Sequence, residues 1–404
     1  MTRRTVAWVS VAVAASLLVV GGIAVTATGA LTPRETGPAS VPITPQTGDA
    51  EPERRTAASA AAVFLDEWVD GGRVVRRDQG GDTVSEGQAY GLLVALAADD
   101  EAAFDEIWTW TAENLQRSDA LLAWRWEGGR IVDDEPASDA DLDAARALAL
   151  AADKWQREDL GLEADRLATV LIERMTAPVP SGLILLPGLW AAGEPAVYNP
   201  SYASPAAFSV LGQRTGDPRW AALAEGSRAT TGALLDVAPL PSDWARVGSD
   251  GTVSVSGGPS DADTVVRYSY DAARLPVRYA ESCDPADVAL AARLAPALLR
   301  EDDGRAVLDL GGSPENEERH PLALAARAGA VAGTGDIEGA DRDLAAADLL
   351  SQEQPTYYGT AWTALAANLL TRSDLGGCAI LPSDEATNDD GTTAPGSDAQ
   401  KAGE

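Results

Sequence analysis

The chain has 404 residues, and 62 acidic against 31 basic residues give it a formal net charge of −31. Such a negative chain disfavours nucleic acid and anionic membrane surfaces as partners. Its one histidine excludes a zinc site built from several histidines. Its two cysteines lack a C-x-x-C spacing, which excludes a zinc ribbon and a dithiol redox motif.

The N-terminal residues 1–31 have the pattern of an export segment. Arg3 and Arg4 precede an uncharged stretch that is most apolar from Ala7 to Val25, and positive charge ahead of an apolar run predicts that the chain after the run is translocated. The run approaches membrane-spanning length, but the small residues after it could be a cleavage site. A cleaved signal peptide and an uncleaved anchor both remain open, and either predicts an extracellular protein, secreted or held at the cell membrane.

Composition divides the rest of the chain into three parts. Residues 32–53 are rich in Pro, Thr and Gly and predict a disordered linker, and residues 383–404 predict a disordered acidic tail. Residues 54–382 have the size of one large domain, which we expect to be a monomer.

Within this domain, apolar residues recur at spacings of three and four, as in Leu290, Leu294 and Leu298. The pattern predicts helices near 55–69, 86–98, 101–117, 140–155, 162–174, 203–214, 218–235, 270–280, 286–300, 320–331, 341–350 and 358–371. Short extended pieces are expected at 123–126 with 130–132, and at 252–255. The predicted class is all-α, with paired helices closed into an (α/α)6 barrel. An irregular α-solenoid is the alternative, although no fixed-period repeat supports it.

Two acids stand at predicted helix starts. Ser85 and Gln88 have capping-box spacing, which places Glu86 in the first turn of a helix. Ser138 precedes Asp139 in a similar position. Each acid could simply stabilise the helix dipole, but aromatics near both suggest carboxylate chemistry on a sugar. A calcium loop is not expected at residues 139–143, because the loop glycine and the closing Glu are missing.

Aromatic residues occur in three further segments. Trp124 and Trp126 alternate in an extended piece, which predicts that both lie on one side. Tyr202 follows a proline-broken turn, and Tyr270 precedes Asp271 and Arg274. The spacing of Asp271 and Arg274 fits a structural ion pair, or a catalytic base with the group that positions it.

The remaining polar candidates concern stability. Behind an export signal, a disulfide between Cys283 and Cys378 is the natural hypothesis, and two buried free thiols are the alternative. His320 stands in a polar segment before a proline, which is typical of a surface turn.

Several segments together resemble glycoside hydrolase family 8, the endoglucanase and cellulase D family. Residues 85–91 (SEGQAYG) are similar to the segment of the general acid, and residues 137–143 (ASDADLD) to the family signature. Residues 122–126 (LAWRW) resemble its subsite-lining aromatic piece, and residues 198–202 (YNPSY) resemble a turn of cellulases from bacterial cellulose synthesis. Residues 270–276 (YDAARLP) resemble the segment that carries the base in many members.

The resemblance implies an (α/α)6 barrel that cleaves internal β-1,4 bonds of a polysaccharide with inversion and without a cofactor or metal. Glu86 would be the general acid, Asp271 the general base, and Asp139 the ligand of the sugar at the cleavage point. Residues expected to bind substrate are Trp124, Trp126, Tyr202, Tyr270 and Arg274. Chitosan, xylan or lichenan as substrates, and a non-catalytic glycan-binding barrel associated with polysaccharide synthesis, are the alternatives.

Overall fold

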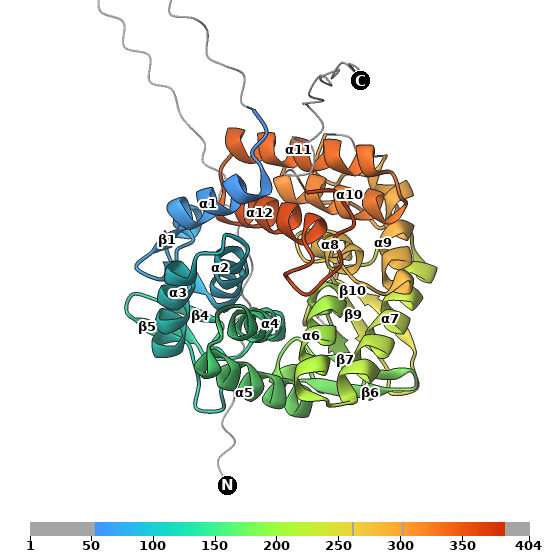
Figure 1. Cartoon of the computed structure of the whole chain (residues 1–404). Helices are drawn as coiled ribbons and strands as arrows, with labels where there is room; N and C mark the ends of the chain where they lie inside the picture. Colours follow the sequence, from blue (N-terminus) through green and yellow to red (C-terminus); the bar gives the residue numbers. More distant parts are fainter. Residues whose placement is uncertain (1–52, 261, 301–302, 384–404) are drawn as a thin grey trace, which may run out of the picture. The chain divides into compact units, whose positions relative to one another are not determined.

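The computed structural model describes residues 53–260, 262–300 and 303–383, and within them twelve α-helices form two concentric rings (Figure 1). The inner ring consists of α2 (Ser85–Ala97), α4 (Ser138–Trp155), α6 (Pro205–Thr215), α8 (Leu275–Ala280), α10 (Pro321–Gly333) and α12 (Tyr357–Thr371). The outer ring consists of α1 (Ala57–Trp68), α3 (Glu101–Asn114), α5 (Glu158–Arg174), α7 (Arg219–Val237), α9 (Pro285–Leu298) and α11 (Ile337–Glu353).

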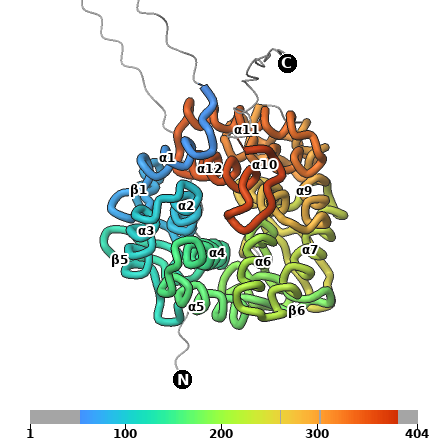
Figure 2. The backbone as a smooth tube through the Cα atoms, viewed as in Figure 1, coloured from blue at the N-terminus to red at the C-terminus, as the bar shows by residue number. Residues whose placement is uncertain are grey.

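Each inner helix contacts the next inner helix along the chain, and α12 returns to contact α2. The ring is therefore closed, and the outer helices pack behind it (Figure 2). This arrangement confirms the predicted (α/α)6 barrel and excludes an open solenoid for the described residues. The predicted helices all occur; the expected helix 270–280 is split into a short 3₁₀ turn, Ala272–Arg274, followed by α8.

Burial differs between the two rings because their surroundings differ. In α2 every residue from Gly87 to Ala97 is buried, since helices on several sides cover it. The outer helix α5 buries Leu160, Ala164, Leu167 and Leu171 and exposes its other face. The outer helix α5 therefore carries the amphipathic pattern that sequence analysis detects, whereas α2 is covered on all sides and shows no such division into two faces.

Ten short strands lie in the connections between the helices of the described region. They are β1 (Val69–Asp70), β2 (Arg73–Val74), β3 (Thr83–Val84), β4 (Arg125–Glu127), β5 (Arg130–Asp133), β6 (Thr176–Val179), β7 (Gly182–Leu185), β8 (Ala196–Tyr198), β9 (Trp244–Val247) and β10 (Val253–Ser256). All pair antiparallel, in the orders β1-β2, β3-β4-β5, β6-β7 and β8-β9-β10. The expected pieces at 123–126, 130–132 and 252–255 correspond to β4, β5 and β10.

The β6-β7 hairpin was not predicted from the sequence. Pro178 lies within β6 and Gly182 is the first residue of β7, and both residue types weaken a strand pattern. The hairpin packs on α7 through a close approach of backbones: a Cβ on Gly226 would lie 2.1 Å from the carbonyl oxygen of Leu183. Packing against the helix, and not local propensity, therefore stabilises these strands.

The predicted capping box at Ser85 is absent. The N-cap of α2 is Val84, and the Ser85 hydroxyl makes no hydrogen bond. The Gln88 amide instead accepts from the backbone N–H of Val74 at 2.6 Å and donates to the Thr111 hydroxyl at 2.7 Å. Gln88 thus supplies hydrogen-bond partners to the buried Val74 N–H and the buried Thr111 hydroxyl. Because buried polar groups need such partners, its side chain is used there and not at the helix cap.

Ser138 does not cap its helix either. The N-cap of α4 is Ala137, and the buried Ser138 hydroxyl has no hydrogen-bond partner. Ser138 donates its backbone N–H to the Pro187 carbonyl at 3.1 Å, so it already lies inside the helical turn.

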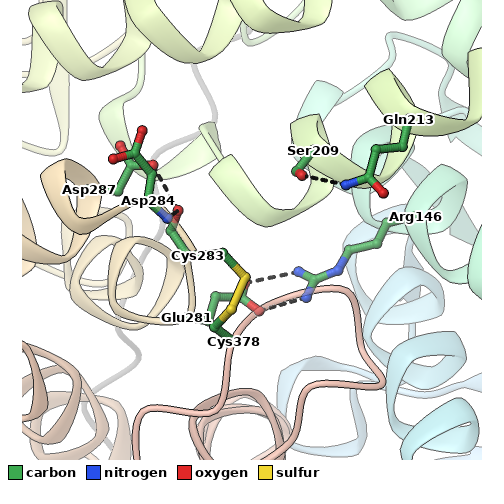
Figure 3. Close-up of a disulfide and its surroundings, with 9 residues drawn as sticks. Arg146, Ser209, Gln213, Glu281, Cys283, Asp284, Asp287 and Cys378 are labelled. Carbon is green, nitrogen blue, oxygen red and sulfur yellow. Dashed lines mark hydrogen bonds and ion pairs between the residues drawn. A yellow bond between two sulfur atoms is a disulfide. The ribbon is translucent and has the colours of Figure 1, made fainter. Parts of the chain in front are cut away.

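A disulfide joins Cys283, between α8 and α9, to Cys378, after α12 (Figure 3). Beside it, the buried guanidinium of Arg146 on α4 forms a two-point ion pair with Glu281, at 2.9 and 2.6 Å. Arg146 also donates to the carbonyl oxygen of Leu375 at 2.8 Å. The disulfide and the hydrogen bond from Arg146 to Leu375 thus tie the segment after the last helix to two other sectors of the ring, and the ion pair joins α4 to the end of α8.

None of the helices within residues 53–383 is long and apolar enough to cross a membrane. The export segment predicted for residues 1–31 lies outside the described residues. The predicted linker and tail also lie outside them, apart from residues 53 and 383.

Candidate active site

Three predicted acids meet near the N-terminal ends of inner helices. Glu86 is the second residue of α2, Asp139 is the second residue of α4, and Asp271 precedes the 3₁₀ turn that leads into α8. Because inner helices adjoin around the ring, residues 185 positions apart in sequence can lie within reach of one side chain: Glu86 and Asp271 both contact Arg274.

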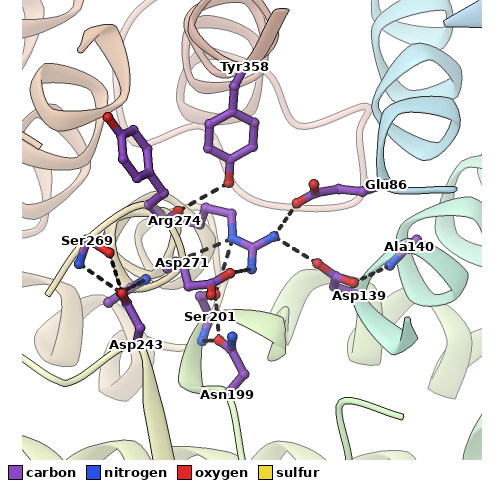
Figure 4. A network of polar contacts seen from close by, with 12 residues as sticks. Glu86, Asp139, Ala140, Asn199, Ser201, Asp243, Ser269, Asp271, Arg274 and Tyr358 are labelled. Carbon is purple, nitrogen blue, oxygen red and sulfur yellow. Dashed lines mark hydrogen bonds and ion pairs between the residues drawn. The ribbon is translucent and has the colours of Figure 1, made fainter. Parts of the chain in front are cut away.

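Arg274 is the centre of the site (Figure 4). Its Nη1 donates to a Glu86 oxygen and, at 2.8 Å, to Asp139 Oδ2, while its Nη2 donates to Asp271 Oδ1 at 2.8 Å. The guanidinium is almost fully buried at 1% exposure. A planar guanidinium spreads five N–H donors over three nitrogen atoms and can serve three carboxylates that lie on different sides of it, whereas a lysine offers three donors from a single atom.

Tyr90 holds Glu86 from within α2. Its hydroxyl donates to Glu86 Oε1 at 2.6 Å and accepts from Trp362 Nε1 at 3.2 Å. Burial, with the charge of Glu86, raises the pKa of Tyr90 well above its usual value, so the phenol keeps its proton. The spacing of four residues from Glu86 is the signal by which sequence analysis could have selected Tyr90.

Electrostatics separates the two aspartates from ordinary surface acids. Burial raises the pKa of Asp271 to about 6; the charge of Arg274 opposes this, and the charges of Asp243 and Asp139 add to it. Burial likewise raises the pKa of Asp139 to about 6, with Arg274 opposing and Glu86 adding. Such values let an acid exchange a proton near neutral pH, and they are concentrated at functional sites.

A row of aromatic rings leads away from the acids. The Arg274 guanidinium lies over the ring of Tyr202, 5.1 Å from its centroid. Trp244 follows at 6.2 Å from Tyr202, and Trp190 follows at 6.3 Å from Trp244. Trp190 is 41% exposed, which is unusual for so large an apolar side chain. Sequence analysis missed Trp190 and Trp244, which stand in segments without strong periodicity.

The other predicted aromatics have different surroundings. The Trp124 carbonyl accepts from the backbone N–H of Ser85 at 2.9 Å, so Trp124 lies beside the start of α2. Trp126 packs edge-on against Trp110 at 5.3 Å, and the Arg73 guanidinium lies over its ring. The pairing of β4 with β5 shifts register between residues 125 and 126. Such an irregularity interrupts the simple alternation from which a common side was predicted for the two tryptophans.

Tyr270 borders the acids on the side of α12. Its backbone carbonyl accepts from the Tyr358 hydroxyl at 3.1 Å, and its ring lies 6.3 Å from the Tyr358 ring. The substrate-binding roles expected for Trp124, Trp126, Tyr202, Tyr270 and Arg274 stay predictions.

His320 is not in a surface turn, which corrects the expectation from sequence. It is buried at the N-cap of α10, where its Nδ1 accepts from the backbone N–H of Leu322 at 3.2 Å. Its ring packs against Tyr270 at 5.1 Å and Tyr358 at 6.0 Å. The local sequence is polar, but in the folded protein the side chains of Tyr270 and Tyr358 cover His320.

Among the described residues, no group of three or more His, Cys, Asp or Glu side chains is arranged to hold a metal ion. The three acids share one arginine, Arg274.

The sequence model of the glycosyl hydrolases family 8 matches residues 63–366, which include all four residues of this centre. The chain belongs to this family. It is therefore a glycoside hydrolase, and the (α/α)6 barrel agrees with the family's structural neighbours.

Relatives within family 8 include a probable endoglucanase of Novacetimonas hansenii, 32% identical over 57% of this chain and 68% of that protein. The endoglucanase of Escherichia coli strain K12 is 34% identical over 48% of this chain and 53% of its own length. The solved structure of the endo-β-1,4-glucanase CMCax from Acetobacter xylinum has a TM-score of 0.62 and 27% identity, over 78% of this chain and 97% of that one. The matched sequence thus spans between about half and two thirds of the two curated relatives.

Proposed function

We propose that this chain is an endo-β-1,4-glucanase that hydrolyses internal bonds of a β-linked glucan with inversion. The observation that carries the proposal is the gathering of Glu86, Asp139 and Asp271 around Arg274. Relatives named as endoglucanases support the choice of a glucan.

In the proposed reaction Glu86 donates its proton to the glycosidic oxygen as the bond from that oxygen to the anomeric carbon breaks. Asp271 takes a proton from a water molecule, whose oxygen forms the new bond to the anomeric carbon from the opposite face of the ring. Asp139 holds the sugar at the cleavage point and stabilises the positive charge that develops there. Atoms and charge balance, because one water molecule is added and one proton passes through each carboxyl group.

The aromatic row supports a polymeric substrate. Rings of Tyr202, Trp244 and Trp190 succeed one another at 6.2 and 6.3 Å and end at an exposed tryptophan. A succession of aromatic rings suits contact with consecutive sugar rings, which a single small sugar would not require.

The disulfide supports a location outside the reducing cytosol, because disulfides persist in oxidising compartments. We propose that the enzyme works after export, consistent with the export segment predicted from residues 1–31. Fractionation of cells that express the full chain tests this, and enzyme confined to the cytosol with two free thiols would contradict it.

The first test incubates the purified protein with carboxymethylcellulose, lichenan, xylan and chitosan and measures new reducing ends. We expect release from a glucan, and we expect Glu86→Gln to lower kcat by at least a thousandfold, since the amide cannot donate the acid's proton. Glu101→Gln is the matched control: it alters another first-turn glutamate, on the exposed start of α3, and should leave the rate unchanged.

The outcomes separate the alternatives. Release from chitosan or xylan alone would keep the mechanism and change the substrate. Binding without release from any polymer would favour a non-catalytic glycan-binding barrel. The anomer first released from a glucan tests inversion, and a β-configured product would contradict it.

A further inference from the structure

Asp243 lies behind the proposed base and takes no part in the proposed reaction. It stands just ahead of β9, far in sequence from the residues it contacts. Its Oδ1 accepts from the backbone N–H groups of Ser269 at 2.7 Å and Ala272 at 2.9 Å, and its Oδ2 accepts from the Ser269 hydroxyl (Figure 4).

These three donors bracket Asp271. Ser269 lies two residues before it and Ala272 directly after it, so the Asp243 carboxylate spans the turn from which the base projects. A carboxylate that accepts several N–H and O–H bonds holds a turn more firmly than neutral acceptors do. The backbone N–H of Asp243 in turn donates to the Arg267 carbonyl at 2.9 Å, so Asp243 is bonded twice before Asp271, at Arg267 and Ser269, and once after it, at Ala272. We call these contacts of Asp243 the clamp.

We propose that Asp243 is a positioning residue for the catalytic base: it fixes the 269–274 turn so that Asp271 meets Arg274 and faces Glu86 and Asp139. The inference rests on the proposed function for the role of Asp271. Asp243 touches neither Arg274 nor the other two acids through any hydrogen bond of the described residues, so it acts through the turn.

The charge of Asp243 has a second effect, because it raises the pKa of Asp271. Removing that charge while keeping the side-chain shape should therefore lower the pKa of Asp271. The titratable and charged groups facing the Asp243–Asp271 pair from the surrounding elements are Arg267, Arg274, Asp139, Tyr202, Tyr268 and Tyr358. None of them is altered by the substitutions that test the proposal.

The test compares Asp243→Asn with Asp250→Asn in the full-length protein. Asp250, in the β9-β10 turn, is a close match: its carboxylate also accepts from the backbone N–H and the hydroxyl of one residue, Thr252, at 2.9 and 2.7 Å, but it is exposed. We expect Asp243→Asn to lower kcat about tenfold, because small displacements of a catalytic group are costly. The acidic limb of its pH profile, where kcat/KM falls as pH decreases, should move to lower pH. Asp250→Asn should behave as wild type.

Ser269→Ala gives an independent reading. It removes the hydroxyl donor to Asp243 and keeps both carboxyl groups and both backbone N–H bonds, so we expect a smaller loss of kcat and a smaller shift of the acidic limb than in Asp243→Asn. This variant remains informative even if Asp243→Asn does not fold.

A direct measurement separates failure of this inference from failure of the proposed function. The carbon NMR signal of the Asp271 carboxyl, assigned by its loss in Asp271→Asn, reports the pKa whether or not the chain hydrolyses a polymer. A lower pKa in Asp243→Asn supports the clamp. Wild-type kcat and an unchanged Asp271 titration in Asp243→Asn would overturn it, while an active Asp271→Asn enzyme would overturn the proposed base instead.

Discussion

Arg274 determines what the three acids can do. Carboxylates that share a site without a cation repel one another, and one of them then holds a proton. Here burial raises the pKa of Asp271 and of Asp139 to about 6, and Arg274 limits the rise. Asp271, the proposed base, is therefore expected to be mostly ionised only above about pH 6, and activity should fall as pH drops through that value.

Replacing Arg274 tests this balance. Arg274→Met removes the cation, so the pKa of Asp271 should rise and the acidic limb of kcat/KM should move above pH 6. Arg274→Lys keeps the charge but replaces the planar fork by a single donor atom that cannot reproduce its spacing, and we expect kcat to fall about a hundredfold or more. The acidic limb is measured from the pH dependence of kcat/KM, and the loss of kcat is measured at saturating substrate.

The matched control is Arg278→Lys. Arg278 lies one turn later, is equally buried, and forms a two-point ion pair with Asp143 at 2.6 and 2.6 Å. Its replacement should lower stability without moving the acidic limb. If Arg274→Met kept the wild-type limb, the assignment of that limb to Asp271 would be wrong.

Among the secondary-structure elements, α7 and β7 approach each other so closely that their backbones leave no room for a side chain at Gly226. A Cβ at Gly226 would lie 2.1 Å from the Leu183 carbonyl oxygen and 2.7 Å from its backbone nitrogen, so either the helix or the hairpin must move. We expect Gly226→Ala to lower the free energy of unfolding by about 3 kcal/mol. Denaturant titration measures it.

Gly232 supplies the control on the same helix. A Cβ there meets only Leu290, at 3.9 Å. Gly232→Ala should therefore raise stability by about 0.5–1 kcal/mol, through helix propensity alone. Equal effects at both positions would contradict the close-packing argument.

The start of α10 depends on a neutral histidine. Burial lowers the pKa of His320 to about 4, and its Nδ1 must be unprotonated to accept from Leu322. The unfolded chain, with a histidine pKa near 6.5, binds a proton that the folded chain resists. The stabilisation is therefore complete above about pH 6.5 and is lost as pH falls towards 4.

His320→Asn should remove this dependence, because asparagine can cap a helix and does not titrate in this range. We expect wild type to lose about 3 kcal/mol more than the variant between pH 7 and pH 4. Denaturant titration across this range is the measurement, and parallel curves for the two proteins would exclude the mechanism.

For the whole molecule, the disulfide joins residues 95 positions apart and bridges the α8–α9 connection to the segment after α12. Closing so long a loop removes chain entropy from the unfolded state. We expect replacement of both Cys283 and Cys378 by serine to lower the free energy of unfolding by about 4 kcal/mol. Thermal and denaturant unfolding report the loss.

Reduction of the wild-type protein should reproduce the effect of the double variant. The hydrogen bonds from Arg146 to the Leu375 carbonyl and from the Cys378 N–H to the Glu281 carbonyl would still hold the same segment, so we expect the reduced protein to remain folded at moderate temperature. An unchanged stability after reduction would show that the cross-link contributes nothing to the fold.

The sequence by itself predicted the twelve helices and the all-α class, and it selected Glu86, Asp139, Asp271 and Arg274 as candidates, since helical periodicity and short motifs are local properties. Tertiary structure alone decided which groups meet. Gln88 forms hydrogen bonds with Val74 and Thr111 and does not cap its helix. His320 is buried against two tyrosines, and Asp243 accepts a hydrogen bond from Ser269, 26 residues later in the chain. These contacts depend on the closed ring, because only ring closure brings distant segments together and removes their polar groups from water.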